Sequence, residues 1–146
     1  MGQDHAARNT EGLDQLRELV RQLRDLDLTR PVGGDGWTVS STLAHLAFWD
    51  NVAVERWTQF DRRGAFTDMA DPVFDIVNAA ALEQWRALPP RLAADQAVAA
   101  AEAVAARIAG LSASAVEAAV TTGRPFMVDR TIHWTPHLRE IDRALG

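Results

Sequence analysis

Hydrophobic residues recur at helical spacing over most of the chain. Between Thr10 and Asp27, leucine and valine follow one another at intervals of three and four residues, with charged residues on the other face. This period predicts an amphipathic helix, and Thr10 is a suitable N-cap residue. A second helix is predicted over 40–61, where Ser40 or Ser41 can cap the start and a broad apolar arc follows.

The second half of the chain continues this pattern with breaks at proline and glycine. Asp71 followed by Pro72 marks a helix start, because proline is favoured at the first helical position. We interpret the segment from there to Ala109 as one long helical arm that Pro89 and Pro90 interrupt. The remaining predicted helices are 112–120 and 127–145.

The fold class follows from these periods. No segment sustains the alternation of polar and apolar residues that is typical of a β-strand. Four principal amphipathic helices, with a short Gly/Pro-rich first connector, predict an all-α antiparallel four-helix bundle. At 146 residues the chain is predicted to form a single domain over 1–146.

Composition removes several function classes. The net charge is −5 and no basic run carries interleaved aromatic residues, which argues against a nucleic-acid partner. No apolar stretch reaches membrane-spanning length and no N-terminal run resembles a signal peptide, so we expect a cytoplasmic protein with no membrane partner. The chain contains neither cysteine nor lysine, which excludes disulfides, a thiolate nucleophile within the chain and Schiff-base chemistry.

The candidate chemistry lies in three of the four histidines. His133 and His137 are four residues apart on the last predicted helix and therefore share one face, although Pro136 is expected to bend the helix between them. His45 lies at the edge of the apolar arc of the second helix, and His5 lies in a predicted frayed start. Neutral imidazole is a common metal ligand, and three protein ligands leave coordination positions open. The hypothesis is a three-histidine metal site; the alternative is three unrelated histidines in a helical core.

Other polar residues share these helix faces. Arg56 lies on the same side of its predicted helix as His45, and Arg130 lies on the same side of the last helix as His137. Each arginine can therefore bind a carboxylate of a substrate or thiol; the alternative for each is an interhelical salt bridge. Asp129 can orient an imidazole from outside the ligand set, or face solvent. Trp49 and Trp134 flank the proposed site, but aromatic residues at helical spacing are more often core residues.

Two sequence motifs resemble a known superfamily. The segment GWTVSSTLAHLAFWD and the C-terminal H-x-x-x-H pair are similar to the signatures of DinB-like proteins, which include YfiT-type proteins and the N-terminal domain of mycothiol-dependent maleylpyruvate isomerase. The resemblance implies a DinB/YfiT-like four-helix bundle in which His45, His133 and His137 hold a divalent metal, zinc or nickel. It also implies chemistry with a low-molecular-weight thiol, which binds the metal and becomes a thiolate, and a homodimer.

Three functions follow as hypotheses. The first is a metal-dependent enzyme acting on a small molecule: a thiol-dependent transferase or isomerase, or a metal-assisted hydrolase. The second is a non-catalytic helical module that binds or sequesters a ligand and whose histidines are structural. The third is a protein with a purely structural metal, whose shell a carboxylate such as Asp129 or Glu140 would close.

Overall fold

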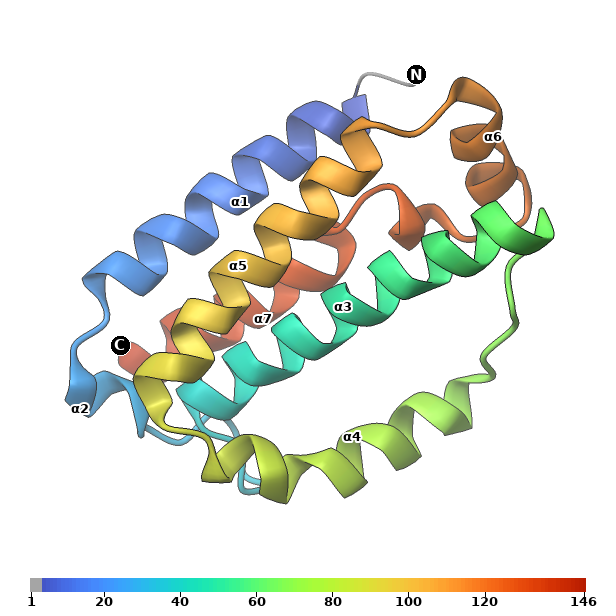
Figure 1. Ribbon diagram of the computed structural model, residues 1–146. Helices are drawn as coiled ribbons and strands as arrows, with labels where there is room; N and C mark the ends of the chain where they lie inside the picture. The colour runs from blue at the N-terminus through green and yellow to red at the C-terminus, as the bar shows by residue number, and fades with distance from the viewer. Residues whose placement is uncertain (1–3) are drawn as a thin grey trace.

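The computed structural model describes residues 4–146, and most of them are helical (Figure 1). The helices are α1 (Asp4–Gln22), α2 (Asp25–Leu28), α3 (Val39–Arg63), α4 (Asp71–Ala87), α5 (Pro90–Ala109), α6 (Ala113–Thr121) and α7 (Thr131–Leu145), with a 3-10 helix η1 at Pro125–Met127. In this part of the chain there is no β-strand, and the one extended pairing is an isolated bridge between Pro31 and Thr38. The all-α prediction is confirmed.

The helices α1, α3, α5 and α7 contribute most of the side chains of the main hydrophobic core. α5 packs against both α1 and α3, and α7 contacts the same two helices (Figure 1). The side chains of Trp57 and Trp134 are fully buried at the centre of this core. Gly12 allows α1 to approach α7 closely, because a Cβ atom at this position would lie 2.8 Å from Thr131 Cγ2.

α3 carries one site histidine and is defined at both ends by its capping residues. Thr38 is the N-cap: its hydroxyl accepts from the Ser41 amide at 3.1 Å, and the Ser41 hydroxyl accepts from the Thr38 amide at 2.8 Å. The predicted cap at Ser40 or Ser41 is therefore wrong by two or three residues. Gly64 ends the helix with φ of 71°, a left-handed conformation that favours glycine.

The first helix begins earlier than predicted. α1 starts at Asp4, and the Thr10 hydroxyl donates to the carbonyl of Ala6, which lies in the preceding turn, at 3.0 Å. Thr10 is thus an internal helix residue and not a cap. His5 is buried in α1, with 8% of its surface exposed, and the predicted frayed start is wrong for it.

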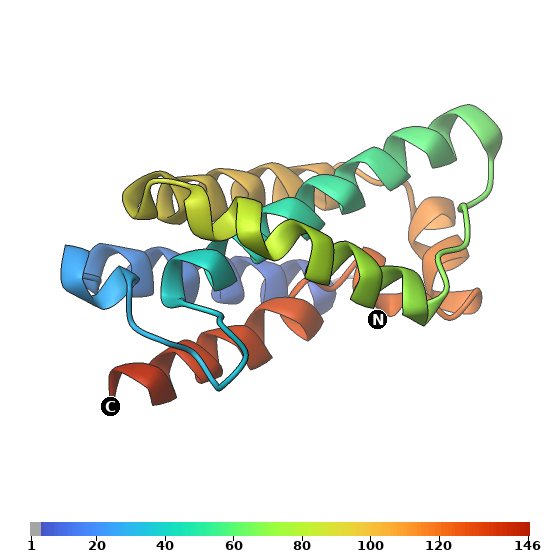
Figure 2. The same ribbon diagram turned by 90° about the horizontal axis from the view of Figure 1, so that it is seen from below.

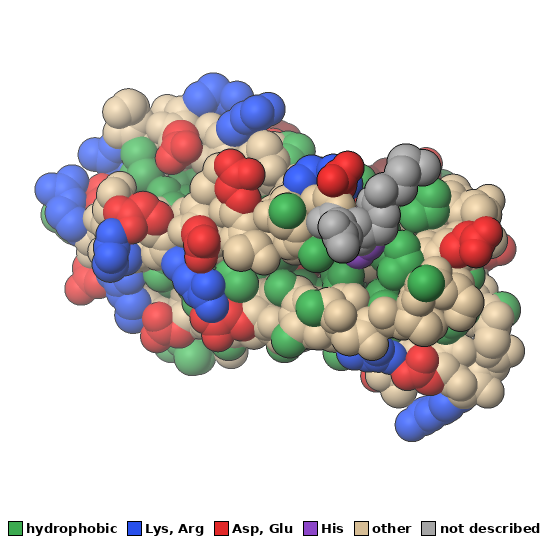
Figure 3. All heavy atoms as spheres, turned by 90° about the horizontal axis from the view of Figure 1, so that it is seen from above, with side chains coloured by type: hydrophobic (Ala, Val, Ile, Leu, Met, Phe, Trp, Pro, Cys, Tyr) green, Lys and Arg blue, Asp and Glu red, His purple; other side chains and the backbone are tan. Residues whose placement is uncertain are grey.

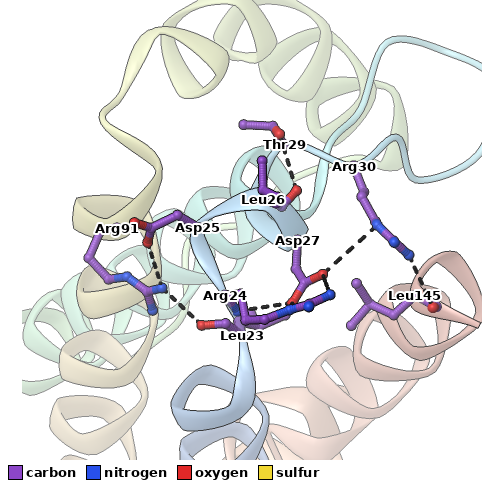
Figure 4. Close-up of polar contacts among 9 residues, drawn as sticks. All are labelled: Leu23, Arg24, Asp25, Leu26, Asp27, Thr29, Arg30, Arg91 and Leu145. Atoms are coloured by element: carbon purple, nitrogen blue, oxygen red, sulfur yellow. Dashed lines mark hydrogen bonds and ion pairs between the residues drawn. The ribbon is translucent and has the colours of Figure 1, made fainter.

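The predicted first helix is also interrupted near its end, where α2 forms a corner (Figure 4). Arg91 from α5 donates to the Leu23 carbonyl at 2.9 Å and to the Asp25 carboxylate at 3.0 Å. Arg30 donates to the Leu145 carbonyl at 3.1 Å. These contacts join the corner around α2 to the start of α5 and the end of α7.

The segment predicted as one interrupted arm is two separate helices. The chain turns at Pro89 and Pro90, and α5 returns into the core while α4 lies along the outside of α3 (Figures 1 and 2). Consecutive prolines remove backbone donors and force the preceding residue into an extended conformation, which Leu88 adopts with ψ of 140°. Trp85 is the only buried residue of α4.

The surface carries charges of both signs. Acidic and arginine side chains are interspersed over the face seen from above, with small apolar patches between them (Figure 3). Among residues 4–146, no single helix is both long and apolar enough to cross a membrane. α5 and α6 meet the criteria of length and composition only when taken together, and they are bent by 108° relative to each other.

Candidate metal centre

Three imidazoles converge on one point. The Nε2 atom of His45, on α3, lies 2.9 Å from Nε2 of His133 and 3.2 Å from Nε2 of His137, both on α7. One ligand atom from each histidine lies within 4.8 Å of the others. α7 remains one helix through Pro136, so both of its histidines reach the same site.

The arrangement of these nitrogens fits a divalent metal. A neutral imidazole Nε2 carries either one proton or one lone pair, so His45 cannot make a good hydrogen bond to both of its neighbours at once. A tetrahedral zinc ion lying about 2.0–2.1 Å from each nitrogen would hold its ligand atoms about 3.3 Å apart. The observed contacts of 2.9 and 3.2 Å are close to that separation.

The protonation states also suit a metal. Burial lowers the pKa of His45 to about 3, helped by the charge of His137 and opposed by the Asn78 side chain. Burial lowers the pKa of His133 to about 2, and the charge of Arg130 acts in the same direction. Both imidazoles are therefore neutral at physiological pH, which is the form that binds metals.

Glu140 contacts the centre from outside. Its Oε2 atom lies 3.0 Å from Nδ1 of His137, which places a proton on Nδ1 and leaves the Nε2 lone pair free. Glu140 is not among the ligand atoms, which in the described residues come from three imidazoles only. The Nδ1 atoms of His45 and His133 are buried and have no hydrogen-bond partner among residues 4–146.

Aromatic side chains enclose the first histidine. The rings of Trp37 and Trp85 each lie 5.4 Å from the His45 ring, edge to face. Trp49 is buried nearby, and its indole N–H donates to the Asn78 carboxamide at 2.7 Å. The sequence did not place Trp37 or Trp85 at the site. Trp37 lies in the connector before α3 and Trp85 lies on α4, and helical spacing does not show that either ring contacts His45 on α3.

Arg130 forms the interhelical salt bridge that was the alternative to a ligand-binding role. Its side chain is 5% exposed, and its Nε donates to Asp50 on α3 at 2.8 Å. The indole N–H of Trp134 donates to the other oxygen of Asp50 at 2.8 Å. Burial raises the pKa of Asp50, while the charge of Arg130 and the indole N–H oppose the rise. Sequence reasoning missed Asp50, although its position three and seven residues before Ala53 and Trp57 placed it on the buried face.

Asp129 lies at the start of α7 and interacts away from the imidazoles. It pairs with Arg8 at 2.7 Å and accepts from the Thr131 amide at 3.1 Å. Its contacts join α1 to the start of α7 and satisfy the amide of Thr131, the first residue of the helix that carries two of the histidines.

The imidazoles line a cavity of about 1170 Å³ bordered by residues of α3, α4 and α7. Such a volume is ample for a small-molecule ligand. Arg56, Arg124 and Phe126 line the same cavity. Arg124 was missed at the sequence level because it lies in a turn, where helical spacing gives no information about its neighbours.

These features define an all-α protein with a three-histidine cluster, able to hold a metal ion, beside a ligand-sized cavity. Residues 10–141 match the family described as the mycothiol maleylpyruvate isomerase N-terminal domain, and the chain belongs to this DinB/YfiT-like family. The resemblance found in the sequence motifs is thereby confirmed. No curated protein and no solved structure matches the chain.

Proposed function

We propose that this protein is a metalloenzyme of the DinB/YfiT type, in which a four-helix bundle places His45, His133 and His137 around a divalent metal, zinc or nickel. The reaction is thiol-dependent transfer or isomerisation, or metal-assisted hydrolysis, of a small molecule. The observation that carries this proposal is the convergence of three Nε2 atoms at the edge of the cavity. Family membership supports it.

The proposed chemistry needs an activated nucleophile. A bound divalent metal lowers the pKa of a coordinating thiol or water and so supplies a nucleophile at neutral pH. The chain has no cysteine, so a thiolate here belongs to a small-molecule co-substrate. Glu140 fixes the His137 tautomer, and the rings of Trp37 and Trp85 keep water from the buried side of His45.

The ligand set favours a catalytic over a structural metal. A structural zinc is closed by four protein ligands, whereas a catalytic zinc has three and keeps a position for water or substrate. Among the described residues, the cluster contains three imidazoles and no carboxylate, because Asp129 and Glu140 bond elsewhere.

Metal content measured by plasma mass spectrometry tests the proposal. Wild-type protein should carry about one equivalent of metal, and His137→Ala should lose it, because two remaining imidazoles bind weakly. His5→Ala is the matched control: it removes a buried histidine of α1 that lies outside the cluster, and it should keep the metal. Circular dichroism should show unchanged helical content in both variants. A wild-type protein that takes up no zinc or nickel would favour the non-catalytic binding module instead.

A further inference from the structure

Arg56 is a cation without a carboxylate partner. Its Nε atom is buried and has no hydrogen-bond partner, and one terminal nitrogen donates to the Thr67 carbonyl at 3.2 Å. Among residues 4–146, no carboxylate forms an ion pair with it. Because the guanidinium lines the cavity and has no counter-charge among residues 4–146, its terminal N–H groups are poised to bind an acceptor from outside the chain.

Aromatic rings hold the guanidinium groups in place. The Arg56 guanidinium carbon lies 5.9 Å from the centre of the Phe66 ring and 5.6 Å from that of Phe126. The Arg124 guanidinium carbon lies 5.3 Å from the centre of the Phe66 ring. Stacking of this kind orients a guanidinium through its face and leaves N–H donors at its edge for a ligand.

The other two arginines near this end of the cavity have ion-pair partners. Arg124 pairs with Asp68, and Arg130 pairs with Asp50. Burial lowers the pKa of Arg56, and the charge of Arg124 lowers it further, while Asp68 opposes this effect. Arg56 is therefore the arginine of this group whose guanidinium has no ion-pair partner among residues 4–146, and its planar fork fits a carboxylate.

The spacing along α3 sets the length of the ligand. Arg56 follows His45 by 56 − 45 = 11 residues on the same helix. Eleven residues make about three turns, so the two side chains share a face of α3 and their Cα atoms are about 16 Å apart along the axis. Both residues line the same cavity, which therefore has the imidazoles toward one end and Arg56 toward the other.

We propose that Arg56 and Arg124 form a carboxylate-binding subsite, and that the substrate or thiol co-substrate is an elongated monocarboxylate spanning the cavity. The carboxylate accepts hydrogen bonds from Arg56, and the opposite end of the molecule carries the group that reaches the imidazoles. The spanning arrangement rests on the proposed metal function. The subsite itself does not, because it is built from residues that bind no metal.

Calorimetry on the metal-free protein tests the subsite alone, with hexanoate and hexanol as probes. Wild type should bind hexanoate about tenfold more tightly than hexanol, the size expected for charge-assisted hydrogen bonds. Arg56→Met should abolish the preference, because methionine keeps a long side chain against the rings but has no charge. Arg63→Met is the matched control, since Arg63 is exposed on α3 and lies outside the cavity lining.

Three results would overturn the subsite: equal affinity for the two probes in wild type, an unchanged preference in Arg56→Met, or displacement of hexanoate by equimolar inorganic phosphate. If Arg56→Met does not fold by circular dichroism, Arg56→Lys serves in its place. Lysine keeps the charge but lacks the planar fork, so the preference should fall severalfold while the fold is retained.

The spanning arrangement is tested on cobalt-loaded protein with ω-mercaptoalkanoic acids of increasing chain length, each compared with the mercaptoalcohol of the same length. Thiolate binding is followed by the cobalt absorption. The affinity gain from the carboxylate should reach about tenfold at one length and vanish in Arg56→Met. The spanning arrangement is overturned if wild-type protein binds the mercaptoalcohols but binds the mercaptoalkanoic acids no more tightly at any chain length. Failure to load any metal overturns the proposed function, and the calorimetry then decides the subsite separately.

Discussion

The three site histidines differ in what surrounds them. His45 is enclosed by tryptophan rings and is 6% exposed, whereas His137 is partly exposed and bonded to Glu140. His133 is held on the same helix face as His137, and its second nitrogen is buried without a partner among residues 4–146. Among residues 4–146, the carboxylate of Glu140 is therefore the hydrogen-bond partner of a site imidazole that can be changed without removing a ligand.

Glu140→Gln should weaken metal binding about 10- to 100-fold and leave the stoichiometry at saturating metal unchanged. The neutral amide accepts a weaker hydrogen bond from His137 and no longer raises the basicity of the imidazole. Competition with a chelating dye measures the affinity. Asp142→Asn is the control, because it removes the same charge from an exposed position of α7. Equal loss in both variants would mean that only the charge of the helix matters.

At the scale of elements, α3 and α7 must keep their register for the imidazoles to meet. The ion pair between Arg130 and Asp50 joins these helices, and the indole of Trp134 contributes a second bond to the same carboxylate. The pair is almost fully buried, with side-chain exposures of 5% and 0%. Removal of one partner would leave a charge in an apolar interior, which is far more costly than the loss of a surface pair.

Asp50→Ala should lower the free energy of unfolding by about 3–5 kcal/mol, because Arg130 is then buried without a counter-charge. Urea denaturation of the metal-free protein measures this. The comparison is Asp61→Ala, which breaks the exposed pair with Arg107 and should cost less than about 1 kcal/mol. Similar losses in the two variants would show that the buried pair contributes little.

Helices were predictable from the sequence wherever one face meets the core. The interpretation of 40–61 and 127–145 as helices finds α3 and α7 at nearly these positions, and the i, i+4 spacing of His133 and His137 places both on one face of α7. The turn at Pro89 and Pro90 was visible as a break, but its direction was not. That direction depends on where Trp85 docks, which is a tertiary contact without a local pattern.

The residues of the candidate site also fall into those that the sequence identifies and those that it does not. The histidines were identifiable because only four occur in the chain and three follow helical patterns. Their neighbours were not identifiable: Trp37 lies in a connector, Trp85 on the outer helix α4 and Arg124 in a turn. The hydrophobic period gives no information about which of these residues lie close together in space.

At the scale of the whole molecule, the cavity exists because α4 lies outside the core formed by α1, α3, α5 and α7. α4 is attached to α3 through its buried Trp85 and through the contacts of Phe74 and Asn78 with Trp49, and Phe74 and Asn78 also line the cavity that the histidines line. The fold thus buries the imidazoles of His45 and His133 beside a cavity that is open to ligands. Because these imidazoles resist protonation in the folded protein, the free energy of unfolding depends on pH.

The metal-free protein should lose stability as the pH falls from 7 to 5. The folded-state pKa values of His45 and His133, about 3 and 2, lie below the value near 6.5 expected after unfolding. The unfolded chain then takes up protons that the folded chain excludes, so stability is complete above the unfolded pKa and declines below it. Each histidine contributes a slope of up to about 1.4 kcal/mol per pH unit.

Urea denaturation with a chelator present measures this slope. His133→Leu removes one of the two groups and should reduce the slope by about half. Wild-type stability that stays constant between pH 7 and pH 5 would contradict the burial of neutral imidazoles.

The position of His45 beside the indole rings of Trp37 and Trp85 has an optical consequence. Indole emission is quenched by an adjacent imidazolium and by paramagnetic ions, and both indoles lie within 5.4 Å of the imidazole, measured between ring centres. The chain therefore contains its own fluorophores beside the centre. Occupancy by an open-shell ion, or protonation of the imidazole, changes the light that the protein emits without any added label.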